Sequence, residues 1–462
     1  MELQKKNTGD LSEFKTKEAA SRLLSESMDK LAKVGGFSFL ENTIDGIQNV
    51  NPERKARKNI FLSDPEKKKE REELKKRLQI WIELLNQSSS VREIAEKCAE
   101  KGETAEKTLT KNLGKALETF RDLELAYRSV ALFYKNTESD KVKNISIVNA
   151  SLDQLTDLDD TRFIDYIGEE LKQHFDRLDL RENYSLLVIP GYMGSNKVIE
   201  KWAKIAFQNK VMLVTDFANL EKPDDVIDLF TDANFTGGDV YRSNTIMTCN
   251  WLVGRGKLDK YGEEEDLFIP PSSALAGKMY YTLLSQVTAG KKHGGMNEVD
   301  AVRFDLKKSE ISQIEKLGLV PMVNEYGKVM AFSAKTLFNG DNLGLQTYSV
   351  VRVFDHITKV LFDFLNRRAF ENWTTLTERD LRDQITRFLD EIKGPDKLIE
   401  KFRIQRLEQD PKQKDRIYLD IHISPYFPAK SFVIKLDGRK GNSDSGEQNT
   451  NSNNWNAEYK QS

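Results

Sequence analysis

Two short apolar runs enclose a helix-length segment in the middle of the chain. Residues 184–190 (YSLLVIP) and 211–215 (VMLVT) are almost continuously apolar, and residues 196–208 lie between them. A short apolar run that ends at Pro and Gly is typical of a buried strand. Strand, helix and strand at this spacing predict a βαβ unit whose parallel strands are covered on both faces. We therefore expect an α/β fold at the centre of the chain.

Further periodic segments surround this unit. Residues 319–324 and 328–333 predict two strands that turn at Tyr326-Gly327, and residues 144–150 (NISIVNA) predict another strand. The helices predicted from apolar spacing are 163–175, 272–289, 348–370 and 378–392. Together these elements predict the α/β (α+β) class, with a central mixed sheet flanked by helices.

The strongest helix signal precedes these strands. Leucine and aromatic residues recur at steps of three and four, which is the spacing of one helix face. The stripe consists of Leu109, Leu113, Leu117, Phe120, Leu123, Tyr127, Val130 and Tyr134. Because such a stripe is apolar along its whole length, we expect the helix to bury it against another surface.

The N-terminal region is polar and rich in charge. A cationic block at residues 54–77 looks like a nucleic-acid-binding arm, but acidic residues interleave with it, so a solvated helix face is the simpler interpretation. The chain has 71 Lys and Arg against 73 Asp and Glu, and this balance does not favour nucleic acid as a partner. It contains no secretory signal and no apolar run of about 18 residues. We expect a cytoplasmic protein without direct membrane insertion.

Two alternating segments lie near the C-terminus. In residues 417–423 and 432–436 apolar and polar side chains alternate, which predicts two half-buried strands joined through Pro425 and Pro428. Beyond Asp437 the composition buries too little apolar area to offset the entropy lost on ordering. The expected regions are a helical N-terminal region (1–104), an α/β core (105–437) of one or two subdomains that ends in the strand pair 417–436, and a disordered tail (438–462).

No pattern of catalytic or ligand-binding residues emerges. The segment 190–197 (PGYMGSNK) connects a strand to a helix, but a P-loop has its lysine directly after the second glycine and then Ser or Thr, whereas Val198 follows Lys197 here. The histidines are scattered, Cys98 and Cys249 are far apart in sequence, and Gly-x-Ser-x-Gly is absent. The sequence predicts no catalytic residue, no cofactor and no metal.

Part of the long helix resembles a known family. Residues 120–124 (FRDLE), followed by Tyr127, Arg128 and 134–137 (YKNT), are similar to the large sheath subunit (TssC/VipB) of bacterial type VI secretion systems. The signature residues are Phe120, Arg121, Asp122, Leu123 and Glu124. Similar stretches recur in the same order at 184–189, 267–279, 317–321, 331–332, 348–372 and 424–427. The likeness covers roughly residues 115 to 437.

One loop departs from the family pattern. The family has an acidic, aromatic stretch after its strand, whereas this chain has residues 190–195 (PGYMGS). The departure indicates a divergent, Bacteroidetes-like branch.

The resemblance implies a structural protein and not an enzyme. Members of the family pair with a small sheath subunit (TssB/VipA-like) and polymerise as stacked hexameric rings around an Hcp-type inner tube. The sheath stands on a baseplate that anchors it indirectly to the envelope, and its contraction ejects the tube. A ClpV-type AAA+ ATPase dismantles contracted sheaths for recycling. A sheath protein of a phage-tail-like contractile particle is an alternative, and so is a divergent α/β ligand-binding or enzymatic domain.

Two segments are candidates for the contacts that the resemblance implies. The C-terminal strands are expected to pair between subunits through Ile417, Leu419, Ile421, Ile423, Phe432, Ile434 and Leu436. The candidate ATPase-recognition helix carries an apolar stripe of Phe14, Leu23, Leu24, Met28 and Leu31. An internal hairpin in the first case, and docking of the helix within its own chain in the second, are the alternatives.

Overall fold

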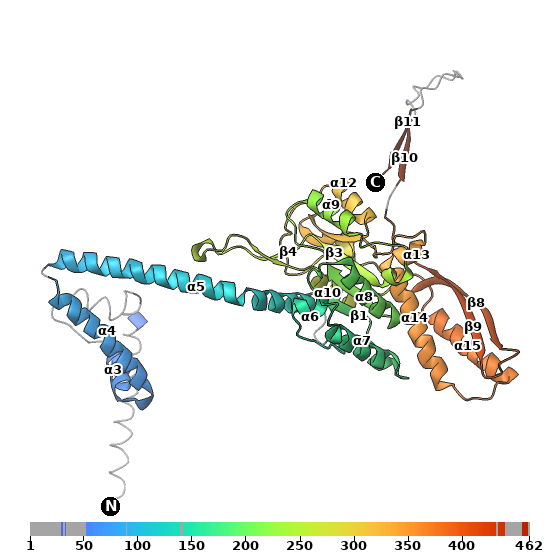
Figure 1. The fold of residues 1–462 in the computed structure, drawn as a ribbon, viewed down its shortest axis with the longest axis horizontal. Coiled ribbons are helices and arrows are strands. Elements are labelled where there is room, and N and C mark those ends of the chain that lie inside the picture. Colours follow the sequence, from blue (N-terminus) through green and yellow to red (C-terminus); the bar gives the residue numbers. More distant parts are fainter. Residues whose placement is uncertain are drawn as a thin grey trace, which may run out of the picture. The chain divides into compact units, whose positions relative to one another are not determined.

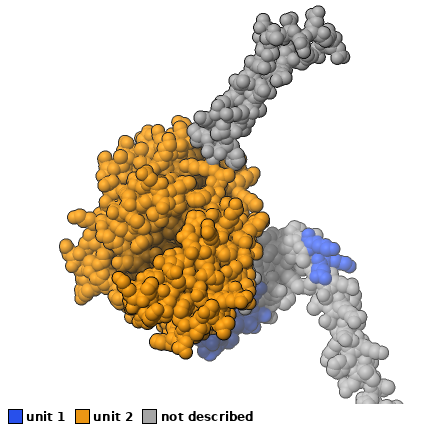
Figure 2. Space-filling model, turned by 90° about the vertical axis from the view of Figure 1, so that its right-hand side faces the viewer, with its two compact units in different colours: residues 1–109 blue, residues 110–462 orange. Residues whose placement is uncertain are grey.

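The structure is a computed structural model with two compact units, residues 1–109 and 110–462 (Figure 2). It describes residues 29–30, 33, 52–88, 90–138, 142–430, 433–438 and 455–460. Among these residues no helix is both long and apolar enough to cross a membrane. The five residues of the candidate ATPase-recognition stripe lie outside the described ranges.

The first unit is helical (Figure 1). It comprises α3 (Pro52–Ser63), a 3-10 turn (Pro65–Lys67), α4 (Lys68–Asn86) and the beginning of α5 (Val91–Asn136), which continues into the second unit. None of the side chains described between residues 56 and 109 is buried. In these described residues the unit therefore has no hydrophobic core of its own.

A five-stranded sheet forms the centre of the second unit (Figure 1). Its order is β1 (Leu186–Ile189), β2 (Met212–Asp216), β3 (Thr245–Cys249), β6 (Leu319–Glu325) and β7 (Lys328–Ala331). The first four strands are parallel, and β7 is antiparallel to β6. The predicted βαβ unit, the hairpin at Tyr326-Gly327 and the mixed sheet are all confirmed.

Helices pack on both faces of this sheet. One face carries α7 (Arg162–Phe175), α8 (Asn196–Gln208), α9 (Pro223–Ala233) and α12 (Lys308–Lys316). The other carries α10 (Ser272–Tyr281), α14 (Tyr348–Arg367) and the C-terminal part of α5. Successive side chains of a strand point to opposite faces, so β2 supplies Leu213 to the first core and Met212 and Val214 to the second.

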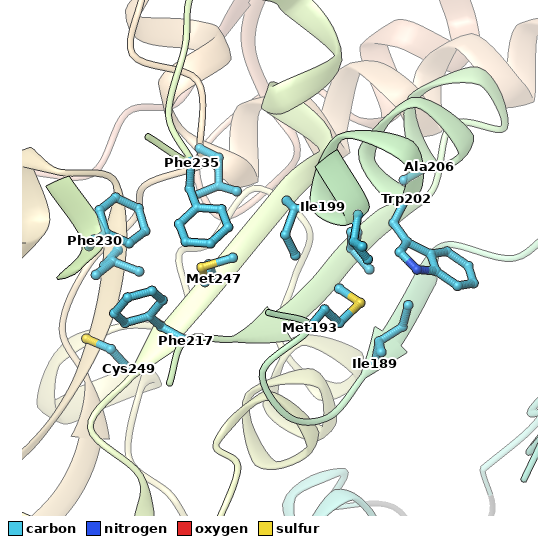
Figure 3. Packing of buried hydrophobic residues seen from close by; sticks show 14 of the residues in the cluster. Ile189, Met193, Ile199, Trp202, Ala206, Phe217, Phe230, Phe235, Met247 and Cys249 are labelled. Carbon is cyan, nitrogen blue, oxygen red and sulfur yellow. The ribbon is translucent and has the colours of Figure 1, made fainter. Parts of the chain in front are cut away.

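The first core combines aliphatic side chains with a group of aromatic ones (Figure 3). The ring of Phe217 packs edge-to-face with Phe230 at a centroid distance of 5.2 Å and with Phe235 at 5.8 Å. Trp202 is almost completely buried and donates its indole N–H to the carbonyl of Leu155 at 2.9 Å. Each aromatic pair contributes about 0.5–1.5 kcal/mol beyond the area that it buries. This core therefore gives the second unit a rigid centre.

The C-terminal part contains two separate strand pairs. β8 (Ile399–Gln409) pairs antiparallel with β9 (Ile417–Pro425), and β10 (Val433–Gly438) pairs antiparallel with β11 (Trp455–Lys460). A third core joins α14, α15 (Thr375–Glu391) and the β8–β9 pair.

Two observations bear on the strands expected in this region. Within the chain the segments 417–423 and 432–436 do not form the internal hairpin that was the alternative, because β8 reaches β9 through the shorter connection 410–416. Within the tail that was expected to be disordered, Trp455–Lys460 forms a strand, because backbone hydrogen bonds to β10 do not require an apolar composition.

Two other elements differ from expectation. Residues 144–150 form no strand, and Ile147 and Val148 within them are exposed. The helix expected over 272–289 ends at Tyr281, because Thr282 adopts an extended backbone. The remaining short elements are α6 (Leu152–Thr156), β4 (Leu252–Arg255), β5 (Leu267–Ile269), α11 (Gly290–His293), α13 (Leu343–Gln346) and the 3-10 turns Leu180–Glu182, Val240–Asn244 and Asp259–Tyr261.

Candidate assembly interface

The C-terminal half of α5 belongs to the second unit and packs on the rest of that unit through one face. Leu132 is buried in the second core, and the side chain of Asn136 exchanges hydrogen bonds with the backbone of Asn297 at 2.8 and 3.3 Å. At Gly277 of α10 an added Cβ would stand 2.4 Å from the carbonyl oxygen of Phe133. Only glycine fits at this position, so the two helices meet at the level of their backbones.

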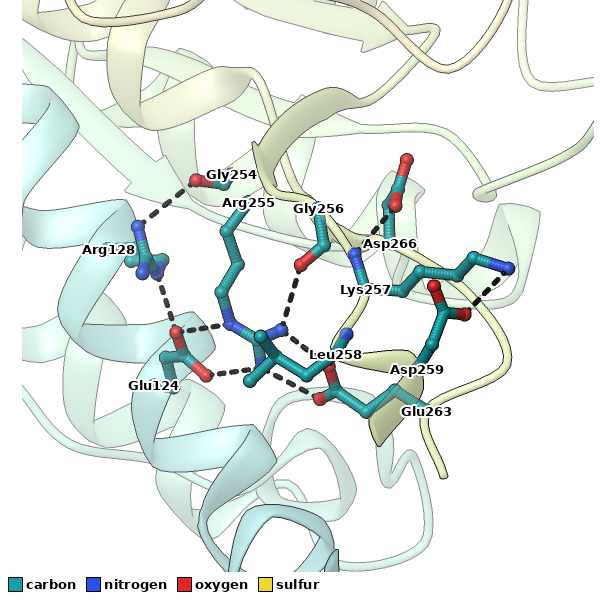
Figure 4. A network of polar contacts seen from close by, with 10 residues as sticks. All are labelled: Glu124, Arg128, Gly254, Arg255, Gly256, Lys257, Leu258, Asp259, Glu263 and Asp266. Carbon is teal, nitrogen blue, oxygen red and sulfur yellow. Dashed lines mark hydrogen bonds and ion pairs between the residues drawn. The ribbon is translucent and has the colours of Figure 1, made fainter. Parts of the chain in front are cut away.

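A cluster of ion pairs joins α5 to β4 and to the segment after it (Figure 4). Arg255 donates to both carboxylate oxygens of Glu124, with Nε–Oε1 and Nη2–Oε2 each at 2.9 Å. It also donates to both oxygens of Glu263, at 2.6 and 2.7 Å. Arg128 completes the group, because it donates to Glu124 at 2.9 Å and to the carbonyl of Gly254 at 3.1 Å. We call Glu124, Arg128, Arg255 and Glu263 the Arg255 cluster.

The Arg255 cluster is charged at neutral pH. Hydrogen bonds from the Arg255 guanidinium lower the pKa of Glu263 to about 2, and the same guanidinium is the main cause of the lowered pKa of Glu124. The side chain of Arg255 is 17% exposed, so water screens these contacts only partly. Paired hydrogen bonds between guanidinium and carboxylate are among the strongest in proteins. The cluster therefore links α5 to β4 and to Glu263 through strong, charge-assisted hydrogen bonds.

The family signature is divided between two environments. Glu124 belongs to the Arg255 cluster, and Arg121 is close enough to Glu263 to help lower its pKa. Phe120 and Leu123 are exposed, at 59% and 66%, and Asp122 is exposed as well. Glu124 and Arg121 thus lie on the side of α5 that faces the Arg255 cluster, whereas Phe120, Asp122 and Leu123 are open to solvent.

The apolar stripe of α5 is not buried within the described chain, so the surface expected to cover it is not part of these residues. Its exposed members are Leu109, Leu113, Phe120, Leu123, Tyr127, Val130 and Tyr134, and Leu117 is half-buried. If α5 were rotated so that the stripe faced inward, the Arg255 cluster and the close backbone contact at Gly277 would both be lost. An exposed apolar row of this length is typical of a protein-binding surface. We call these residues the α5 stripe.

The C-terminal strands present open edges. In the described part of the chain, β8–β9 and β10–β11 are two-stranded sheets. Their outer edges carry backbone groups that another strand can bind. Ile417 is exposed, whereas Leu419, Ile421 and Ile423 pack on the third core. Ile434 and Leu436 lie in β10, and Phe432 lies outside the described residues.

The loop that was compared with a P-loop is anchored by a buried carboxylate. Asp216 at the end of β2 accepts hydrogen bonds from the N–H of Gly191 and of Ser272, both at 2.8 Å, and from the hydroxyls of Ser272 and Thr248. Burial raises its pKa to about 6. The carboxyl group occupies the Gly191 amide, so this amide is not free to bind a phosphate.

Several of these contacts could not be found in the sequence. Arg255, Glu263 and Asp216 have no distinctive spacing, and their partners lie far away along the chain. The described residues contain no cluster of His, Cys, Asp and Glu that could hold a metal ion.

Three family models cover most of the chain. The central domain of type VI secretion system TssC/VipB matches residues 115–339. The TssC/VipB-like C-terminal domain matches residues 347–461, and the TssC/VipB-like N-terminal region matches residues 24–113.

The chain belongs to the TssC/VipB family.

The resemblance of the sequence to the TssC/VipB family is therefore confirmed. The matches do not distinguish branches of the family. TssC/VipB proteins are structural subunits of the type VI contractile sheath and not enzymes. Membership implies assembly with sheath partners and a baseplate. It also explains why an exposed stripe and open strand edges are distinctive features of this structure.

Two solved structures of the anti-feeding prophage are similar to this chain. A chain of the anti-feeding prophage baseplate has 15% identity and a TM-score of 0.50, over 69% of this chain and 80% of that chain. A chain of the contracted anti-feeding prophage sheath has 15% identity and a TM-score of 0.45, over 70% and 82%. At 15% identity the first likeness shows the fold alone. A search of curated proteins finds no match.

Proposed function

We propose that this TssC/VipB chain is the large sheath subunit that pairs with a small sheath subunit (TssB/VipA-like) through the α5 stripe. The exposure of Phe120, Leu123 and Tyr127 carries the proposal, because 59–72% of each residue is open to solvent. Full burial of such a side chain contributes roughly 1.5–3 kcal/mol. The first unit lacks buried side chains in its described part, so it too gains stability when a partner covers it.

The open strand edges support polymerisation. A head-to-tail interface that does not close produces a helical filament, and strand addition links subunits through backbone hydrogen bonds. Such links persist while rigid domains rotate, which suits a sheath that contracts. In this proposal β8–β9 and β10–β11 accept or donate strands, and the pairs assemble as stacked hexameric rings around an Hcp-type inner tube.

The remaining partners follow from the same assembly. The sheath stands on a baseplate in the bacterial cytoplasm, and a ClpV-type AAA+ ATPase recycles it by recognising the helix that contains Phe14, Leu23, Leu24, Met28 and Leu31. These five residues lie outside the described ranges, so the support for a helix there is the apolar spacing of the sequence alone.

Co-expression tests the proposal directly. The chain is expressed with the small sheath subunit encoded beside it, purified, and viewed by negative-stain electron microscopy. We expect a stable heterodimer and tubules of uniform width. A chain that stays monomeric in the presence of the small subunit would refute the pairing. Tubules that the ATPase does not disassemble would favour a phage-tail-like particle.

A further inference from the structure

A cavity of about 160 Å³ lies in the second unit, apart from the Arg255 cluster and the α5 stripe. Arg352, Asp355, His356 and Lys359 of α14 line one side, and Lys210, between α8 and β2, lines another. A water molecule occupies about 30 Å³ of liquid volume. The cavity is therefore large enough for a small polyatomic ion or the end of an acidic side chain.

The charges around this cavity do not balance. Lys210, Arg352 and Lys359 face a single described carboxylate, that of Asp355. That carboxylate accepts a hydrogen bond from Asn244 at 2.7 Å and lies 3.6 Å from the Lys210 ammonium. The Lys359 ammonium donates to the neutral carbonyl of Tyr184 at 2.6 Å. The lining thus carries two more positive charges than negative ones.

Arg352 is the least satisfied of these cations. The residue is 7% exposed, and its Nη2 donates to the carbonyl of Met279 at 3.1 Å. Its Nε and Nη1 are buried and have no hydrogen-bond partner among the described residues. Burial lowers the pKa of Arg352 to about 10 and that of Lys359 to about 8. Buried cations are normally paired, because removing them from water is costly.

We propose that this cavity binds one oxyanion group, either an inorganic phosphate or sulfate or the carboxylate of an acidic side chain. The ammonium groups of Lys210 and Lys359 have donors to spare, and an oxyanion accepts several hydrogen bonds at once. The negative charge of the oxyanion offsets the excess positive charge of the residues that line the cavity. Because the lining joins α14 to the segment before β1 and to the start of β2, a bound anion ties these elements together. This site goes beyond the proposed sheath function.

A phosphate titration tests the site in the full chain, co-purified with the small subunit and dialysed into chloride buffer. Inorganic phosphate is added at constant ionic strength, and binding is followed by calorimetry. We expect saturable binding to the wild type and binding at least ~10-fold weaker in Lys359→Met and Lys210→Met. Lys204→Met removes an exposed charge of α8 and is the matched control, with the affinity of the wild type.

Two measurements distinguish a free inorganic anion from the carboxylate of an acidic side chain. Phosphate binding that depends on both lysines assigns the site to a free inorganic anion. If phosphate does not bind, a cryo-EM map of the assembled sheath shows whether a neighbouring subunit places an acidic side chain in the cavity, which also supports the proposal. Lys210 is partly exposed, so Lys210→Met serves if Lys359→Met fails to fold.

Two results overturn the proposal. One is a lack of saturable phosphate binding together with a map that has neither an ion nor an acidic side chain in the cavity. The other is phosphate binding with the same affinity in the wild type and both lysine variants. Tubule formation is scored separately, so failure of this site is distinguishable from failure of the proposed function.

Discussion

Glu124 of α5 and Arg255 of β4 are 131 residues apart in sequence, yet two parallel hydrogen bonds of 2.9 Å join their side chains. The same guanidinium binds Glu263, so a single arginine connects the long helix to the segment after β4. This attachment uses the polar side of α5 and leaves the α5 stripe on the outside. The contact that positions the helix therefore also makes the stripe available to a partner.

Replacing Arg255 tests how much the Arg255 cluster contributes to stability. Arg255→Lys keeps the positive charge but cannot make paired hydrogen bonds to two carboxylates, so we expect a loss of about 2 kcal/mol of stability. The measurement is the urea midpoint of the paired complex, followed by tryptophan fluorescence. Arg162→Lys alters an exposed pair with Asp160 and should leave the midpoint unchanged. Equal midpoints for Arg255→Lys and wild type would show that the cluster contributes little.

The α5 stripe should determine pairing with the small subunit. The double variant Phe120→Ser/Tyr127→Ser removes two exposed aromatic side chains, and we expect pairing to weaken by on the order of 100-fold. Because neither side chain belongs to a core of this chain, its own unfolding midpoint should not change. Affinity is measured by biolayer interferometry, with Asp122→Ser as the control on the same helix. Unweakened pairing in the double variant would place the interface elsewhere.

The C-terminal strand pair should be required for polymerisation but not for pairing. A chain that ends at Lys430 lacks β10 and β11, and we expect it to form soluble heterodimers and no tubules. A chain that ends at Lys460 keeps both strands and serves as the control. Negative-stain microscopy and size-exclusion chromatography score the two outcomes. Tubules from the chain that ends at Lys430 would rule out linkage through these strands.

Lys359 should give the chain a distinctive alkaline pH dependence. Its pKa is lowered from 10.5 to about 8, so between these values the unfolded state binds more protons than the folded state. Stability attributable to Lys359 therefore rises as the pH rises from about 8 to 10.5. The charged or titratable groups around it are Lys210, Arg352, Asp355 and His356.

Lys359→Met should remove this dependence. Urea midpoints at pH 7.5 and 9.5 are compared for the wild type and the variant, and the rise with pH should be smaller in the variant. Lys204→Met again controls for loss of an exposed lysine. An identical rise in Lys359→Met and wild type would mean that Lys359 does not titrate in this range.

Local patterns in the sequence were enough to predict much of the fold. The apolar runs that became β1 and β2 predicted parallel, buried strands, because a strand covered on both faces has no polar side. Tyr326-Gly327 predicted the hairpin of β6 and β7, because both residues adopt positive φ in the turn. The collinear stretches also led to the correct family.

Only the tertiary structure shows which way the apolar face of α5 points and with which strand β9 pairs. A helical period shows that Phe120 and Tyr127 share a face, but it cannot show whether the chain itself or another subunit covers that face. Alternation likewise predicted a strand at 417–423 but not its partner, because any strand with a free edge can form the same backbone hydrogen bonds. Sequence by itself thus determined the elements and the family, whereas contacts between distant residues, such as Arg255 with Glu124, decided which surfaces are left for assembly.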